Sequence, residues 1–164
     1  MDNELQEAAV GAISHVFETM FFVFLEPYAP DSGDPPPNPW SPNEHWLKCS
    51  IGFQGNLRGQ LRLFLPFPLA RDLATNFLGL EEKAAEQQVM DMTKELINMI
   101  CGNLFSRYDR VQGYALTIPE AEVIGYGESA GPGPSPESLW LDFLADGRTI
   151  RLEIQRGDYP SSRT

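Results

Sequence analysis

The chain has 164 residues, of which 42% are apolar, and a formal net charge of −11. This length and apolar content suit one compact domain that buries its own core. The acidic balance argues against nucleic acid or an anionic membrane surface as a partner, because phosphate binding needs a clustered basic face. Two cysteines, Cys49 and Cys101, are too few for a disulfide framework or a zinc knuckle, so we expect buried free thiols in a cytoplasmic protein.

The first half of the chain predicts a helix, a loop and two strands. Apolar residues recur at helical spacing from Asn3 to about Glu26, which predicts a long first helix. Seven prolines in the segment 27–42 remove backbone donors, so this segment is predicted to be a loop, and we assign it no role. The segments 46–53 and 57–65 read as two strands of a hairpin, in whose turn Gly55 is expected to take a positive φ.

The second half predicts two helices and three strands. A short helix is expected over 66–80, closed by Gly79, and a second long helix runs from about Glu82 to Tyr108. Strands are expected near 115–126, 139–144 and 149–155, with Asp146-Gly147 as the last turn. The predicted fold class is therefore α+β, with two long helices and a short helix packed on one face of an antiparallel sheet of about five strands. We expect a single domain over 1–156 and a loose tail over 157–164.

A faint internal match at an offset of 77 residues suggests duplicated halves, about 1–80 and 81–156. The first copy contains Ser14, Glu18, Phe21 and Pro42, and the second copy contains Asp91, Glu95, Asn98 and Pro119. Four matched positions can arise by chance. Each set begins on a long helix that leads toward a strand pair, so a pseudo-twofold duplication is a reasonable hypothesis.

One face of the second long helix combines polar residues with a glycine. On a helical wheel the apolar residues that gather as the core stripe are Val89, Met92, Leu96, Ile100 and Leu104. Nearly opposite, about one turn apart, are Asp91, Glu95, Asn98 and Gly102, which we call the polar ridge. Gly102 leaves room for a partner backbone and destabilises the helix by about 0.5–1 kcal/mol relative to alanine. Periodicity alone favours an ordinary solvated face with an incidental glycine.

The segment 91–104, with Pro119 twenty-one residues after Asn98, resembles the signature of the CheC/CheX/FliY phosphatase family. That signature is Asp or Ser, three residues, Glu, two residues, Asn, and a proline just over twenty residues later. The Glu-Leu-x-Asn-Met-x-x-Gly portion is most similar to CheX. Family members with one working helix keep Glu and Asn only in the second half, and the first copy here has Phe21 where the amide belongs. The asparagine-to-proline gap is slightly short for the family.

The resemblance implies a phosphatase that removes the phosphoryl group from the aspartate of a CheY-like response regulator in chemotaxis signalling. It implies that Asn98 positions the attacking water and that Glu95 docks to the active-site lysine of the receiver domain. Asp91 and Gly102 are then partner-binding residues, although Asp91 also has Lys94 as a neighbour on its own helix. The resemblance further implies a homodimer, no cofactor in this chain, and Mg²⁺ in the partner.

The sequence also allows other functions. A non-catalytic adaptor of the same fold would use the same helix to bind a response regulator or a flagellar switch component. A small-molecule hydrolase is a distant third, because no activated nucleophile is recognisable. A metal site is disfavoured, since His15 and His45 lie in different elements without acidic or cysteine partners at ligand spacing. The aromatic cluster 17–24 is most simply core, with self-association as its alternative.

Overall fold

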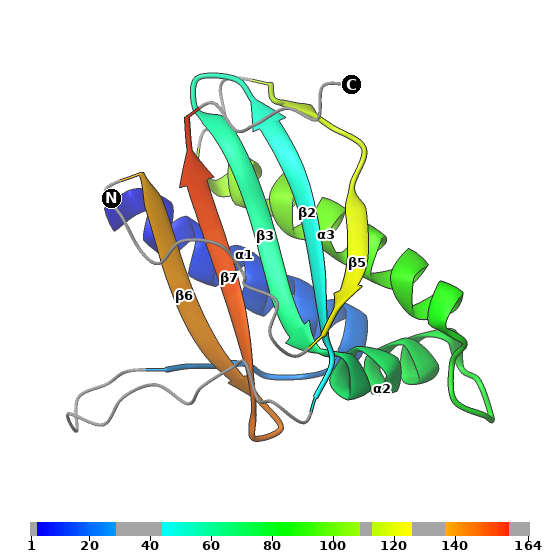
Figure 1. Cartoon of the computed structure of the whole chain (residues 1–164). Helices are drawn as coiled ribbons and strands as arrows, with labels where there is room; N and C mark the ends of the chain where they lie inside the picture. Colours follow the sequence, from blue (N-terminus) through cyan, green and yellow to red (C-terminus); the bar gives the residue numbers. More distant parts are fainter. Residues whose placement is uncertain (1–2, 29–43, 109–112, 126–136, 158–164) are drawn as a thin grey trace.

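A computed structural model describes residues 3–28, 44–108, 113–125 and 137–157. Most of the proline-rich segment, including Pro42, and the tail beyond Gly157 lie outside the described residues. The helices are α1 (Asn3–Phe21), α2 (Phe67–Leu78) and α3 (Glu86–Tyr108). The strands are β1 (Glu26–Pro27), β2 (Trp46–Gln54), β3 (Arg58–Pro66), β4 (Ala115–Leu116), β5 (Glu120–Ile124), β6 (Ser138–Ala145) and β7 (Arg148–Arg156). The predicted α+β class is confirmed, and α1 and α3 lie together behind one face of the sheet (Figure 1).

The sheet is antiparallel throughout its described pairs, with the order β1-β6-β7-β3-β2-β4 and with β5 also pairing β2. The expectation of about five strands was too low, because seven are present in the described part of the chain and two of these have only two residues. The predicted strand over 115–126 is divided into β4 and β5 by Thr117, Ile118 and Pro119. Proline has no N–H to continue the ladder, so the pairing resumes only at Glu120.

The strand order has an internal symmetry. Exchanging β1 with β5, β2 with β6 and β3 with β7 turns the order β1-β6-β7-β3-β2-β5 into the same order read from the other edge of the sheet. The helices that precede these strand sets, α1 and α3, pack against each other. Two duplicated halves would produce this arrangement, and the duplication itself stays a hypothesis.

Helix α1 ends at Phe21, five residues before the predicted end. Phe22 adopts a left-handed conformation with φ 57°, and its N–H donates to the carbonyl of Glu18 at 3.1 Å. This closure of the last turn stops the helix and turns the chain away. The prediction of an aromatic core is therefore right for Phe17, which is fully buried, and wrong for Phe22 and Phe24, which are 83% and 73% exposed.

The prediction that Gly79 closes the short helix is confirmed, since its φ is 67° and the N–H of Leu80 donates to the carbonyl of Thr75. Helix α3 begins at Glu86, four residues later than predicted. The Thr75 hydroxyl holds the N–H of Ala84 at 2.9 Å, and the Gln88 side chain holds the N–H of Ala85 at 2.8 Å. These side-chain acceptors satisfy backbone donors in front of the helix, so the helix does not extend backward.

The two hairpin turns differ in how they use glycine. In the β6–β7 turn, Asp146 and Gly147 have φ values of 51° and 77°, as the predicted tight turn requires. In the β2–β3 turn, the expected positive φ of Gly55 is wrong, because this residue is not among the glycines with positive φ. Gly55 instead makes room for a ring, since a Cβ there would lie 2.6 Å from Tyr114 Cδ1.

The core lies between the helices and the inner face of the sheet, where the alternate residues of β2, β3 and β7 are buried. Both cysteines belong to it, as predicted. Burial raises the pKa of the Cys49 thiol and that of the Cys101 thiol to about 12, so both stay protonated and unreactive near neutral pH. No helix in the described ranges has the length and apolarity needed to cross a membrane.

Candidate functional site

The polar ridge lies on the solvent side of α3. All four of its residues are exposed. Leu96, Ile100 and Leu104, which lie on the opposite side of the helix, have 0% exposure. The core stripe packs on the sheet and on α1, so it fixes the rotation of α3 and with it the direction in which the ridge faces. The predicted orientation of the helix is confirmed.

The two side chains at the centre of the ridge are not engaged within the protein. Across the described residues, Glu95 and Asn98 have no hydrogen-bonding or ionic partner. Asp91 differs, because Gln87 Nε2 donates to its Oδ1 at 2.8 Å. No ion pair joins Asp91 to Lys94 in the described part of the chain, so the cation expected beside Asp91 does not pair with it. The carboxylate of Glu95 and the amide of Asn98 are thus available to a partner molecule.

Gly102 has no structural reason to lack a side chain. A Cβ built at this position meets no atom within 4 Å. By contrast, a Cβ at Gly11 in α1 would lie 2.9 Å from Arg107 Nη1. The fold itself therefore leaves open space above Gly102, on the same face as Asn98. This is the space that a partner backbone would use if it approached the ridge closely.

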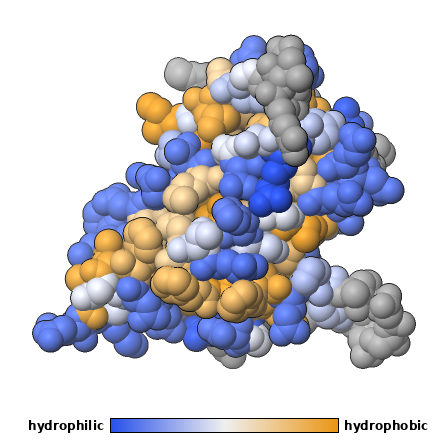
Figure 2. Space-filling view, turned by 180° about the vertical axis from the view of Figure 1, so that it is seen from behind, coloured by the Kyte–Doolittle hydropathy of each residue, from blue (hydrophilic) through white to orange (hydrophobic). Residues whose placement is uncertain are grey.

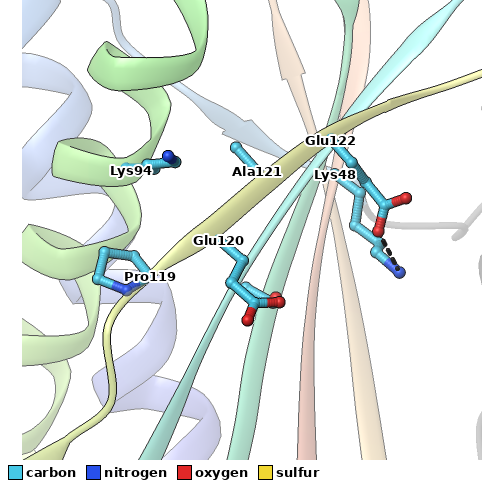
Figure 3. Close-up of a pocket in the computed structure, with 7 residues that line it drawn as sticks. Lys48, Lys94, Pro119, Glu120, Ala121 and Glu122 are labelled. Carbon is cyan, nitrogen blue, oxygen red and sulfur yellow. Dashed lines mark ion pairs between the residues drawn. The ribbon is translucent and has the colours of Figure 1, made fainter. Parts of the chain in front are cut away.

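The segment that carries Pro119 runs beside α3, although it lies about twenty residues further along the chain. Tyr114 stacks on Phe105 of α3 with ring centroids 4.0 Å apart. Further along, Pro119 and Lys94 line one pocket, and Figure 3 shows Pro119 next to α3. The stretch between these two contacts passes alongside the turns of α3 that lie between Phe105 and Lys94. Pro119 is thereby brought to the side of α3 that carries Lys94, one turn before Asn98.

A side-chain and backbone clamp holds this segment in place. Thr117 donates its N–H to the carbonyl of Gly52 at 3.0 Å, and the N–H of Gly52 donates to Thr117 Oγ1 at 2.8 Å. Because Gly52 lies in β2, the clamp ties the connection between β4 and β5 to the body of the sheet. The segment beside the ridge is therefore anchored at Tyr114, at Thr117 and again where β5 begins to pair.

The pocket beside this segment has a volume of about 320 Å³. It is lined by Lys48, Ser50, Lys94, Pro119, Glu120, Ala121 and Glu122. Lys48 Nζ lies 3.4 Å from Glu122 Oε2, on the opposite side of β5 from Lys94 (Figure 3). Two lysines and two glutamates balance in charge, so the lining favours neither an anion nor a cation. It also lacks a nucleophile with a histidine base, which a small-molecule hydrolase of the serine or cysteine type would need.

The first copy of the motif is built differently. On α1, Glu18 is exposed, but Phe21 is only half-exposed. The Phe21 ring packs edge-on against Phe17 at 5.4 Å and against Phe77 of α2 at 5.9 Å between centroids. An aromatic ring that packs on a neighbouring helix thus occupies the position that corresponds to the free amide of Asn98.

The two histidines lie apart from the ridge and are both exposed. Within the described ranges, no group of three or more His, Cys, Asp or Glu side chains is placed to hold a metal ion.

The matching family model is described as the chemotaxis phosphatase CheX, and it matches residues 47–123. This stretch contains the whole polar ridge and Pro119. Over this stretch the chain is similar to CheX of the CheC/CheX/FliY family. No curated protein matches the sequence.

Solved CheX structures share the fold. The CheX structure from Vibrio vulnificus has a TM-score of 0.73 at 19% identity, with 94% of this chain and 97% of that chain covered. CheX from Desulfovibrio desulfuricans has a TM-score of 0.73 at 17% identity, covering 94% and 99% of the two chains. A CheX–CheY–BeF₃–Mg²⁺ complex from Borrelia burgdorferi has a TM-score of 0.70 at 20% identity, covering 96% of this CheX-like chain and 100% of that chain.

Sequence reasoning missed one exposed residue at this site. Ile118, directly before Pro119, is 86% exposed, although isoleucine is among the residue types most often buried. The continuous strand predicted over 115–126 concealed it, because alternate residues of a strand are expected to face the core. The only signal in the sequence was Pro119 itself, which interrupts the strand and frees the residue before it from the sheet.

Proposed function

We propose that this CheX-like protein is an aspartyl-phosphate phosphatase that dephosphorylates a CheY-like response regulator. The observation that carries the proposal is the pair of exposed, unengaged side chains of Glu95 and Asn98, one turn apart on α3, with the open space of Gly102 on the next turn. A family description as a chemotaxis phosphatase supports the reaction. The Borrelia complex of a similar fold with CheY, BeF₃ and Mg²⁺ supports the class of partner.

The proposed reaction requires few catalytic groups from the phosphatase itself. A receiver domain brings its own Mg²⁺, lysine and threonine to neutralise the phosphoryl oxygens, so this chain needs no cofactor of its own. What the receiver lacks is a positioned water. The amide of Asn98 can donate and accept a hydrogen bond, so it would hold a water in line with the scissile bond. The transition state is loose, and proton removal can come late, so no strong base is required.

Glu95 has a different task in this proposal. Its carboxylate, one turn before Asn98, pairs with the active-site lysine of the receiver and fixes the approach of α3. Because Glu95 has no partner within the described residues, it forms the new ion pair without first breaking an internal one. Asp91, which Gln87 already holds, contacts the receiver surface at the edge of the interface. Gly102 admits the receiver backbone close to the helix.

Two substitutions separate catalysis from docking. Asn98→Ala removes the water-positioning amide from an exposed position, so we expect the fold to persist while kcat falls by about two to three orders of magnitude.

Glu95→Ala is expected to weaken binding as well as turnover. The loss should shrink as salt rises, because salt screens the ion pair in the parent protein. The measurement is the rate of phosphate release from purified CheY-like receivers phosphorylated with phosphoramidate, in steps from low to high salt.

An adaptor would give a different result. If Asn98→Ala binds a beryllofluoride-activated receiver normally and dephosphorylates the phosphorylated receiver at the parent rate, the catalytic role of Asn98 is wrong. A parent protein that binds receivers without accelerating phosphate release would replace the phosphatase with the adaptor. Thermal unfolding of each variant serves as the control for the fold.

A further inference from the structure

The connection between β4 and β5 presents an apolar surface next to the polar ridge. Ile118 is 86% exposed and Leu116 is 36% exposed. In the space-filling view of the helix-bearing face, an apolar area lies at the upper left, over this connection (Figure 2). An isoleucine side chain with this exposure buries little apolar surface, so it contributes little to the stability of its own fold.

This surface is continuous with the ridge. The stretch from Tyr114 to Pro119 runs beside α3, between the stacking contact with Phe105 and the pocket shared with Lys94. Ile118 directly precedes Pro119, which shares that pocket with Lys94, and Lys94 lies one turn of α3 before Asn98. On the helix itself, Met99 is 37% exposed and follows Asn98 directly. One exposed apolar side chain thus follows Asn98 on α3, and another lies on the connection that runs along this helix.

The apolar surface is also held in a fixed position. The two hydrogen bonds between Thr117 and Gly52 secure the residue before Ile118 to β2, and Pro119 restricts the backbone after it. A side chain presented by a restrained backbone loses less conformational freedom on binding than one on an unrestrained loop. Ile118 is therefore well suited to act as an anchor at an interface.

We propose that Ile118 is a docking and specificity residue for the receiver domain. Its side chain packs against an apolar side chain of the receiver beside the phosphorylation site. This inference rests on the proposed function, in which a receiver that docks on α3 with its phosphoaspartate at Asn98 meets the connection that runs beside this helix. The charged contacts of the ridge do not distinguish one receiver from another, because receivers share the same active-site lysine and Mg²⁺. The receiver residue that contacts Ile118 is not part of this shared active site and differs between receivers. The contact with Ile118 therefore determines which receiver is the substrate.

The test compares three variants with the parent protein. Ile118→Ser removes the apolar contact, Ile118→Leu retains it, and Phe24→Ser is a control at an exposed apolar position on another part of the surface, 73% exposed. Two quantities are measured with one CheY-like receiver: the Kd for its beryllofluoride–Mg²⁺ form, and the kcat and KM for its phosphorylated form. Thermal unfolding checks that each variant is folded.

We expect Ile118→Ser to raise Kd and KM about tenfold, the effect of losing one well-buried apolar anchor, while kcat stays within about twofold. Ile118→Leu should restore most of the affinity, and Phe24→Ser should match the parent. The inference is overturned if Ile118→Ser leaves Kd and KM unchanged. It is also overturned if the substitution changes only the oligomeric mass in light scattering, since the surface would then contact a second copy of the chain.

The same data separate this inference from the phosphatase proposal. If the parent protein binds the activated receiver without hydrolysing its phosphoryl group, and Ile118→Ser weakens that binding, the docking role stands and the phosphatase role falls. If Asn98→Ala abolishes turnover while Ile118→Ser changes neither Kd nor KM, the phosphatase role stands and the docking role falls. A parent protein that neither binds nor dephosphorylates any CheY-like receiver overturns both.

Discussion

At the scale of single residues, Gly102 is unfavourable for the stability of α3 but leaves space for a partner to approach the helix. Glycine in a helix interior destabilises it, and here no neighbouring atom of the fold would clash with a larger side chain. A position that weakens its own helix and faces open space on the functional side is best explained by the volume of a bound partner. The side chains of Glu95 and Asn98 fit the same explanation, because both are exposed and neither is used internally.

Gly102→Ala is therefore expected to affect stability and function in opposite directions. The free energy of unfolding should rise by about 0.5–1 kcal/mol, measured by urea denaturation, because alanine favours the helix. The Kd for a beryllofluoride-activated receiver should nevertheless increase severalfold, because the methyl group occupies the space that the receiver backbone needs.

Ser106→Ala is the matched control for this prediction. It lies one turn further along α3, is exposed, and improves helix propensity without adding volume. It should stabilise the protein and leave receiver binding unchanged. Normal binding by Gly102→Ala would show that Gly102 does not admit a partner backbone.

At the scale of elements, α1 and α3 occupy equivalent places in a symmetric strand order but present different surfaces. Helix α3 ends its ridge with an open amide and a glycine. Helix α1 has Phe21 at the amide position, with its ring packed on Phe17 and Phe77, and the chain leaves the helix at Phe22. An aromatic ring cannot hold a water by two hydrogen bonds, so the α1 surface lacks the group that the proposed reaction requires.

We expect the α1 surface to be catalytically silent. Glu18→Ala should leave the rate of receiver dephosphorylation within a few-fold of the parent rate. Glu95→Ala, the equivalent change on α3, should reduce it strongly. The phosphate-release assay at fixed receiver concentration compares the two variants directly. A hundredfold loss in Glu18→Ala, with normal thermal unfolding, would show that both helices act.

At the scale of the whole molecule, the sheet has edges that a second copy could cover. On one side, β1 pairs with Phe143 and Leu144 of β6, and the N–H of Tyr28 donates to the carbonyl of Asp142. The segment 138–141 of β6 has no further strand beside it in the described part of the chain. On that strand, Leu139 and Leu141 are half-buried and pack against the core. Pairing two copies through this edge would satisfy backbone groups and bury both leucines, and both polar ridges would stay open.

The protein is accordingly expected to be a homodimer in solution, as CheX resemblance implies. Light scattering at tens of micromolar should give twice the mass of the chain. Leu139→Lys, which places like charges across the pairing edge, should shift the mass toward a monomer, whereas Leu78→Lys on α2 should not. A monomeric mass for the parent protein would contradict the prediction, and a dimeric Leu139→Lys would locate the contact elsewhere.

Much of the fold was determined by local sequence patterns. The apolar stripe from Val89 to Leu104 fixes both the existence of α3 and the face it buries, so the exposure of the polar ridge followed from the sequence alone. Gly79 marked a helix end, and Asp146-Gly147 marked a hairpin, because each of these turns requires residues that tolerate positive φ. The three-residue spacing of Glu95 and Asn98 likewise places them one turn apart on a helix.

Tertiary structure decided features for which neighbours in space, rather than in sequence, determine the outcome. Helix α1 stops at Phe21 although its apolar periodicity continues, because the left-handed Phe22 turns the chain away from the helix axis. Gly55 is required by the ring of Tyr114, which lies about sixty residues away in the chain. The connection that carries the exposed Ile118 is held to β2 by the hydrogen bonds between Thr117 and Gly52, which lie 65 residues apart in the chain. Helical periodicity is a property of a few consecutive turns and can be read locally, whereas these contacts join distant segments, and only the packed sheet and helices bring them together.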